Sequence, residues 1–178
     1  VVAAASYEVR KFGVRSAMPM REALSRCADA ICVRPRMSHY QSVSRQIFTV
    51  FSAFTPLIEG LSLDEAFLDV TASIAAFGPA DSIAAEIKRR VLAETALTCS
   101  VGVAPNKLVA KVGSDAEKPG GFVILTRAEA CARFAGAPPG LVPGIGPRTV
   151  ERLAALGIHT LAALAATDAD VLVDAFGA

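Results

Sequence analysis

Apolar residues recur at helical spacing in two stretches of the chain. The first runs from Ser38 to Pro56, and its apolar stripe comprises Tyr40, Val43, Ile47, Val50, Phe51 and Phe54. The second follows Pro79 to about Glu94, with Ile83, Ile87 and Val91 on the stripe and Lys88 partly outside it. Spacings of three and four predict amphipathic helices, and proline favours the first turn of a helix. We therefore expect two helices, each with one buried face.

Short strand patterns lie between and after these helices. Leu57–Val70 surrounds a polar centre, which favours two short strands or a tight hairpin. Thr98–Val103 and Phe122–Leu125 also have strand patterns, and a helical stripe that opens at Pro105 separates them. This order of elements predicts an α+β fold that resembles a ferredoxin-like arrangement, with helices on one face of an antiparallel sheet.

The C-terminal part of the chain, beyond a boundary that we place near Arg127, is entirely helical and contains a glycine-rich turn. Gly144 and Gly146 permit a tight hairpin, and a helix that starts at Pro147 places the positive end of its dipole beside them. Backbone N–H groups at such a site bind DNA phosphate without reading the base sequence. The pattern predicts a helix-hairpin-helix whose candidate DNA-binding residues are Gly144, Ile145, Gly146, Arg148 and Thr149. An ordinary turn between two packed helices is the alternative.

Asp64 and Glu65 are adjacent carboxylates in an apolar segment, with no basic residue between Glu59 and Thr71. Two such charges repel each other and lose solvation unless a cation neutralises them. A site made of oxygen ligands favours Mg²⁺ or Mn²⁺. A solvent-exposed hairpin tip explains the same pair equally well, so at this point both interpretations stay open.

Basic residues are concentrated near the N-terminus. Val1–Val50 holds 8 Lys and Arg against 3 Asp and Glu, whereas Phe51–Ser100 holds 3 against 7. This separation of charge is expected where an anion-binding region lies next to a cation-binding region. Two ordinary solvated faces would give the same counts of charged residues. Within the basic part, Tyr7 offers a hydroxyl and Arg10 a planar fork that grips phosphate oxygens. Lys118, at a predicted helix end, is a further candidate phosphate ligand, and a solvated basic loop is the alternative.

Composition excludes two classes of protein. A chain of 178 residues with 53% hydrophobic content and 18 basic against 17 acidic residues can bury a core, which excludes a disordered protein. No apolar run approaches the roughly 20 residues that span a bilayer, which excludes a membrane protein. The 4 cysteines form no C-x-x-C pair, so we expect buried thiols in a reducing cytosol and neither a zinc framework nor a disulfide scaffold.

Four motifs occur in the order found in the Y-family translesion DNA polymerases, and the chain resembles the DNA polymerase IV branch of that family over nearly its whole length. The motifs are Ala5–Val14, Leu61–Asp69, Ser100–Lys107 and Ala110–Pro119. The resemblance implies a partial fingers segment at 1–36, a catalytic palm at 37–126 and a helix-hairpin-helix thumb at 127–178. It also implies that Asp64 and Glu65 are catalytic residues that bind two Mg²⁺ ions, with Mn²⁺ as a substitute. The implied ligands of the dNTP triphosphate are Tyr7, Arg10 and Lys118.

The implied activity is low-fidelity, template-directed DNA synthesis past lesions, by two-metal nucleotidyl transfer from a dNTP to a primer 3′ end. Primer-template DNA and dNTP are the expected partners of a monomeric protein of the bacterial cytoplasm. A sliding clamp is expected to bind through segments outside this chain. Two rivals remain. One is a catalytically inactive DNA-binding paralogue with a structural or recruitment role, and the other is a nucleotidyl cyclase, which has no use for a duplex-binding hairpin.

The family pattern also contains parts that we expect to lie outside Val1–Ala178. Its members begin with a palm strand that carries another metal-binding Asp and a steric gate, and a little-finger domain follows the thumb. Near Ala4 a hydroxyl common in relatives is missing, and Gly113 stands where alanine is usual. We therefore expect a polypeptide confined to these residues to fold without polymerase activity, because an incomplete carboxylate set holds the metal pair poorly.

Overall fold

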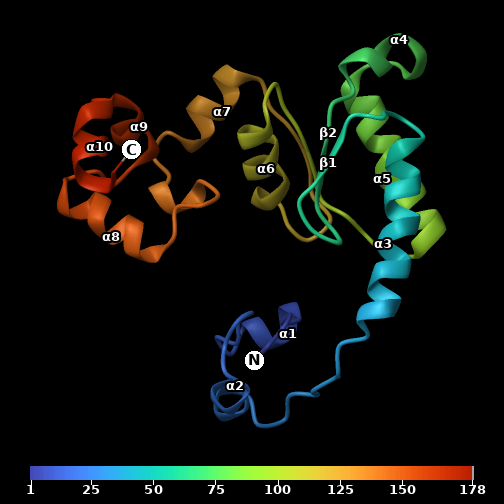
Figure 1. Ribbon diagram of the computed structural model, residues 1–178, viewed down its shortest axis with the longest axis horizontal. Helices are drawn as coiled ribbons and strands as arrows, with labels where there is room; N and C mark the ends of the chain where they lie inside the picture. Colours follow the sequence, from blue (N-terminus) through green and yellow to red (C-terminus); the bar gives the residue numbers. More distant parts are fainter. Residues whose placement is uncertain (178) are drawn as a thin grey trace. The chain divides into compact units, whose positions relative to one another are not determined.

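The computed structural model describes residues 1–177, and the chain divides into two compact units, Val1–Ser42 and Val43–Ala178. In the first unit, α1 (Tyr7–Arg10) and α2 (Met20–Arg26) are short helices (Figure 1). Their small core is formed by Val2, Ala5, Val14 and Ala23. The division between the units falls inside α3 (Met37–Ser52), a few residues beyond the segment that we expect to be the fingers.

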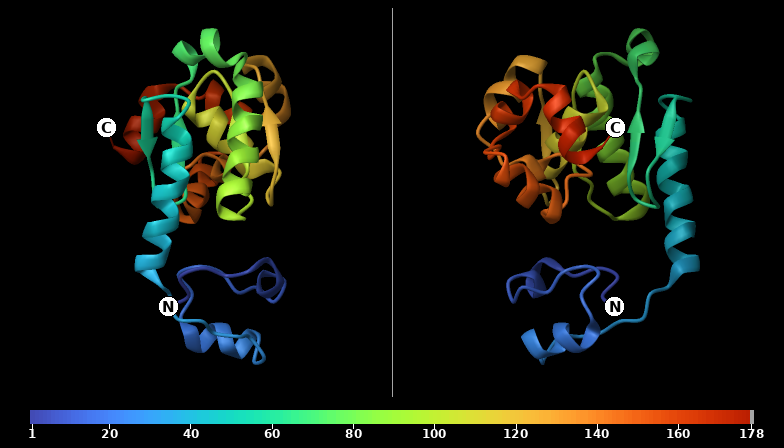
Figure 2. Two further views of the ribbon diagram at one scale, coloured as in Figure 1. Left: turned by 90° about the vertical axis from the view of Figure 1, so that its right-hand side faces the viewer. Right: turned by 60° about the vertical axis from the view of Figure 1, so that its left-hand side comes forward.

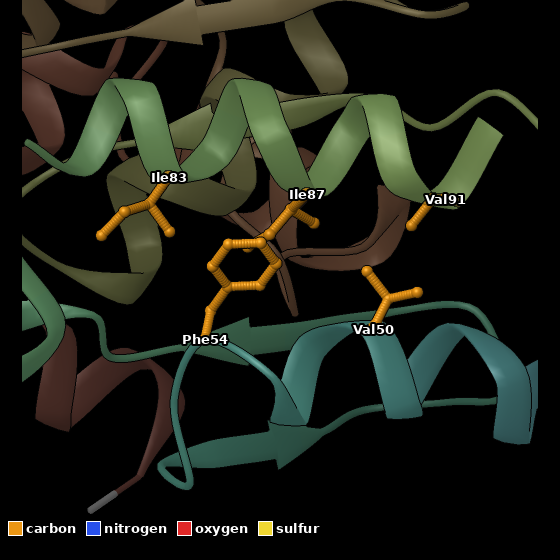
Figure 3. Packing of buried hydrophobic residues seen from close by; sticks show 5 residues of the cluster. All are labelled: Val50, Phe54, Ile83, Ile87 and Val91. Carbon is orange, nitrogen blue, oxygen red and sulfur yellow. The ribbon is translucent and has the colours of Figure 1, made fainter. Parts of the chain in front are cut away.

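The core of the second unit lies between α3 and α5 (Ala80–Thr95). Figure 3 shows five apolar side chains that meet there, from both helices and from the turn after α3: Val50, Phe54, Ile83, Ile87 and Val91. Burial of side chains of this size contributes about 1.5–3 kcal/mol each. The two predicted helices and their buried stripes are thereby confirmed, except that Tyr40, near the start of α3, remains 41% exposed.

A β-hairpin packs beside these helices. Strands β1 (Ile58–Gly60) and β2 (Ala66–Leu68) pair antiparallel, as the pattern of Leu57–Val70 predicts. Leu68 packs against the core cluster, and the hairpin lies alongside α3 in both views of Figure 2. Two short helices, η1 (Thr71–Ser73) and α4 (Ile74–Phe77), connect the hairpin to α5. The hairpin turn therefore projects from an element that the core holds.

The next strands form a parallel pair, which corrects our expectation of one antiparallel sheet. Strand β3 (Val101–Val103) pairs parallel with β4 (Phe122–Ile124), and β1 and β2 form a separate sheet. The reason is the connection through α6 (Lys107–Ala116), because a helical crossover returns the chain to the same end of the sheet. A Cβ on Gly102 would lie 2.1 Å from the carbonyl oxygen of Ala110. Glycine at this position allows α6 to pack directly on the backbone of β3.

Beyond Thr126 the described residues contain helices only, as predicted. They are α7 (Arg127–Phe134), η2 (Pro139–Leu141), α8 (Pro147–Ala155), α9 (Leu161–Ala166) and α10 (Ala169–Phe176). Arg133 of α7 forms an ion pair of 3.0 Å with Glu117, the residue that follows α6. The backbone N–H groups of Leu161 and Ala162, at the start of α9, donate to the carbonyl oxygens of Ala137 and Ala135. These bonds join α9 to the residues that directly follow α7.

The cysteines only partly match our expectation. All four are free thiols, but Cys32 and Cys131 are exposed, and only Cys27 and Cys99 are half-buried. Cys32 lies in the extended segment between α2 and α3, where all neighbours are exposed, and Cys131 lies on the outer face of α7. Burial raises the pKa of the Cys99 thiol. Across residues 1–177 no helix is both long enough and apolar enough to cross a membrane.

Candidate active site and nucleic-acid interface

The two candidate catalytic acids lie in the turn of the β1–β2 hairpin. The backbone N–H groups of Leu61 and Ser62 donate to the carbonyl oxygen of Glu65, at 2.8 Å and 3.2 Å, and close the turn. Ser62 Oγ donates to Asp64 Oδ1 at 2.7 Å. Asp64 is exposed, whereas Glu65, directly before β2, is half-buried. A short, hydrogen-bonded turn therefore carries both carboxylates at consecutive positions.

Glu65 has cationic partners within the chain, so lysine side chains supply part of the neutralising charge that the sequence pattern leads us to expect from a metal ion. Lys111 Nζ of α6 lies 2.5 Å from Glu65 Oε1, and Lys118 Nζ lies 4.0 Å from the same oxygen. No base near the acids in the sequence indicates these partners, because Lys111 belongs to α6 and Lys118 to the loop after it. The structure thus places one candidate metal ligand, Glu65, beside one candidate triphosphate ligand, Lys118.

Asp115 completes a cluster of alternating charge. Its carboxylate lies 2.6 Å from Lys118 Nζ and 3.5 Å from Lys111 Nζ. Burial disfavours the charged ammonium of Lys111, but the hydrogen bond to Glu65 and the charges of Asp115 and Glu65 outweigh it and raise the pKa of Lys111. We call Glu65, Lys111, Asp115 and Lys118 the acid–lysine cluster. Both lysines of the cluster pair with Asp115 and with Glu65, one of the two candidate catalytic acids.

The carboxylate oxygens of Asp64 and Glu65 are suitable ligands for a hard divalent cation, but they would form only part of its site. Carboxylate oxygens are the ligands that Mg²⁺ prefers, and the exposure of Asp64 leaves its oxygens accessible. Within residues 1–177, no three or more side chains of His, Cys, Asp and Glu gather into a group that could hold a metal ion. Asp64 and Glu65 therefore supply two carboxylates, and a complete coordination shell needs ligands from water, substrate or elsewhere.

The other candidate triphosphate ligands lie on α1 in the first unit. The guanidinium carbon of Arg10 is 4.9 Å from the centroid of the Tyr7 ring, and Arg10 Nε donates to the carbonyl oxygen of Ala5 at 3.0 Å. Both side chains are exposed. The structure brings Tyr7 and Arg10 together, while Lys118 belongs to the second unit. Convergence of all three on one triphosphate stays a prediction.

The glycine-rich turn has the predicted form of a hairpin that opens a helix. Ile145 N donates to the carbonyl oxygen of Val142 at 3.0 Å, and Gly144 has a φ of +95°, a conformation that favours glycine. Gly146 is the residue before α8, and Pro147 begins that helix. A Cβ on Gly144 or Gly146 would meet no atom within 4 Å. The outer side of the turn is therefore open to a close-approaching partner, with exposed Arg148 in the first turn of α8.

Comparison with known proteins decides the family. The sequence profile described as the impB/mucB/samB family matches residues 1–115. The chain belongs to that family. A second profile, described as a SAM-like helix-hairpin-helix tandem, matches residues 141–178 and confirms the motif predicted at Val142–Thr149.

Among curated relatives of this impB/mucB/samB chain is the DNA polymerase IV of Pseudomonas paraeruginosa (strain DSM 24068 / PA7). It is 49% identical over 99% of this chain and 51% of the relative. The chain thus spans about half the length of the curated relatives that it matches. Similar solved structures include DinB from Sulfolobus solfataricus, with a TM-score of 0.89 and 34% identity, over 98% of this chain and 52% of that one. An insertion ternary complex of Dbh DNA polymerase has the same TM-score and identity, over 98% and 51%.

These comparisons confirm the resemblance to the Y family and its DNA polymerase IV branch, and the mixed α+β fold with a helix-hairpin-helix. Sequence reasoning gave no role to Lys111, although it is the nearest partner of Glu65. A signal for it was present, since a carboxylate pair without a local base requires a cation from elsewhere in the chain. Which helix supplies that cation depends on tertiary packing.

Proposed function

We propose that the protein containing this chain is a template-directed DNA polymerase of the lesion-bypass type. The observation that carries the proposal is the 4.0 Å separation between Lys118 Nζ and Glu65 Oε1, which joins a candidate phosphate ligand to a candidate metal ligand. The names of its relatives, DNA polymerase IV and Dbh DNA polymerase, support the same activity. We propose residues 1–36 as partial fingers, 37–126 as palm and 127–178 as thumb.

In the proposed reaction, the primer 3′ oxygen forms a bond to the α-phosphorus of the dNTP. The bond between that phosphorus and the oxygen that bridges to the β-phosphorus breaks, pyrophosphate leaves, and the proton of the 3′ hydroxyl passes to solvent water. Asp64 and Glu65 hold Mg²⁺, for which Mn²⁺ substitutes, and two such ions stabilise charge on the attacking and leaving oxygens when bound. Tyr7, Arg10 and Lys118 bind and orient the triphosphate, and most of the catalysis by the chain's own residues is positioning of this kind.

The thumb supplies the proposed contact with duplex DNA. Backbone N–H groups near Gly144–Gly146 and the start of α8 face phosphate oxygens, with Arg148 and Thr149 beside them. Binding of this kind is independent of base sequence and weakens with salt. We also propose that the protein is a monomer of the bacterial cytoplasm and that it copies DNA with low fidelity. A sliding clamp binds it through segments outside this chain.

Primer extension with the intact natural protein tests this function. With Mg²⁺ and four dNTPs, we expect template-directed extension by wild-type protein and none by Asp64→Asn or Glu65→Gln. Glu59→Gln, an exposed acid on β1 that pairs with Lys107, is the matched control and should extend normally. A wild-type protein that binds primer-template without extending it would instead be the inactive paralogue.

A further inference from the structure

Lys88 of α5 makes three contacts that its position on the helix does not predict. Its ammonium donates to the carbonyl oxygens of Cys99 at 2.5 Å, of Gly120 at 2.6 Å and of Gly121 at 3.5 Å. All three acceptors are main-chain carbonyls, and the side chain is half-buried. A lysine ammonium has three donors on a compact charge, so three carbonyl oxygens satisfy it fully.

The carbonyls belong to two segments that lie side by side. Cys99 precedes β3, and Gly120 and Gly121 connect α6 to β4. Gly121 donates its N–H to Ser100 Oγ at 3.2 Å and accepts a bond of 3.0 Å from Val101 N–H. Lys88 therefore adds charge-assisted bonds at the point where the loop after α6 joins the sheet.

That loop begins with Lys118. On its helix side, the main chain of Lys118 makes only a long bond, of 3.5 Å, from its N–H to the carbonyl oxygen of Asp115, although its ammonium pairs with the Asp115 carboxylate at 2.6 Å. The shorter main-chain attachments of the loop are those at Gly120 and Gly121. The main chain at Lys118 is consequently held from the end of the loop that Lys88 contacts, and the ammonium of Lys118 then pairs with Asp115.

We propose that Lys88 is a positioning residue for nucleotide binding, which holds the Lys118–Gly121 loop so that Lys118 stays beside Glu65. This inference rests on the proposed function, since it takes Lys118 as a ligand of the triphosphate. Lys88 itself touches neither acid and acts only through the loop. Replacing Lys88 displaces Lys118 without removing any group that contacts DNA or substrate.

Single-turnover incorporation by the intact natural protein, at varied dNTP concentration, tests the proposal with Lys88→Met, which keeps an unbranched apolar stem of nearly the same length and removes the ammonium group. We expect the dNTP dissociation constant to rise about tenfold, because a displaced ligand loses much of its charge-assisted contact. The maximal rate and the primer-template affinity should change by less than about twofold. Lys88→Arg should recover part of the loss, because it keeps the charge but presents a planar fork.

Two controls separate positioning from general destabilisation. Arg89→Gln removes the neighbouring charge on α5, where Arg89 pairs with Glu86 at 2.6 Å, and should leave dNTP affinity unchanged. Adding Lys88→Met to Lys118→Ala should weaken dNTP binding no further, because the group that Lys88 positions is already gone. Hydrogen exchange should rise at residues 118–122 in Lys88→Met and stay constant across α3.

The outcomes are distinguishable. Wild-type protein that incorporates no nucleotide overturns the proposed function and this inference together. Active wild-type protein with unchanged dNTP affinity in Lys88→Met overturns the inference alone. Additive losses in the Lys88→Met, Lys118→Ala double variant also overturn it, because they show that Lys88 acts independently of Lys118.

Discussion

Lys111 and Glu65 form an ion pair of 2.5 Å although 46 positions separate them in the chain. The pair joins α6 to the hairpin turn that carries the candidate catalytic acids. Lys111 is the more buried partner, with a side chain 20% exposed against 39% for Glu65. Glu65 therefore has a structural partner as well as a proposed metal, whereas within residues 1–177 the side chain of exposed Asp64 bonds only Ser62.

This asymmetry predicts different effects for two variants of the intact protein. Asp64→Ala and Glu65→Ala should each lower the rate of nucleotide incorporation by several orders of magnitude and leave primer-template affinity unchanged. Only Glu65→Ala should also destabilise the fold, by about 1 kcal/mol, because it leaves Lys111 without its nearest acid. Urea unfolding and single-turnover kinetics measure the two effects. A loss of DNA binding in these variants would contradict the assignment of Asp64 and Glu65 to the active site.

A second prediction concerns the hairpin before α8. Gly146 is not in a left-handed conformation and has open space around it, so Gly146→Val should fold normally and block approach to phosphate. We expect weaker binding of primer-template of every sequence, with a shallower dependence of log K on log salt. Gly144→Val should also lower thermal stability, because valine is strained at a φ of +95°. Weakening that depends on DNA sequence would contradict phosphate recognition.

A third prediction concerns Arg10. If its guanidinium grips the triphosphate, Arg10→Ala should weaken dNTP binding by about 1.5–3 kcal/mol, or roughly 10- to 150-fold. Arg10→Lys should restore only part of the affinity, and primer-template binding should stay within about twofold. Lys118→Ala should behave similarly, although the two residues lie in different units. If the incorporation rate depends on dNTP concentration in both variants as it does in wild type, the basic segment is a solvated surface and does not bind the triphosphate.

A fourth prediction uses the capping box of α7. Glu129 Oε2 accepts a hydrogen bond of 2.8 Å from Thr126 N–H, and Thr126 Oγ1 accepts one of 3.2 Å from Glu129 N–H. The backbone and hydroxyl of Thr126 lower the pKa of Glu129. Because the pKa falls on folding, the carboxylate stabilises the protein above the unfolded value of about 4.3, and this is lost as pH falls through the folded value.

The variant Glu129→Gln should therefore unfold at lower urea concentration than wild type near neutral pH. The difference should shrink as the pH falls below about 4. Glu151→Gln, an exposed acid on α8, is the control and should show no such dependence. An equal difference at both pH values would show that Glu129 does not act as a charged cap.

Sequence by itself determined the elements and the kinds of chemistry. The spacing of Ile83, Ile87 and Val91 predicts α5 because a helix buries every third or fourth residue, and the glycine pattern at Val142–Thr149 predicts the hairpin because its signals are local. The neighbouring carboxylates of Asp64 and Glu65 likewise predict a cation site, because two such charges need a neutralising partner. The boundary between strand and helix regions near Arg127 follows from the same periodicity.

Tertiary structure alone decided which distant residues meet. The parallel pairing of β3 and β4 depends on the path of α6, which packs on β3 at Gly102, and only in the folded chain do Lys111 and Lys118 lie beside Glu65. Lys88 fell partly outside the buried stripe of its helix, yet its ammonium lies against three backbone carbonyls of segments further along the chain. Local sequence patterns cannot specify such contacts. The contacts form only when elements that are distant in the chain pack together and bring charged side chains within reach of partners.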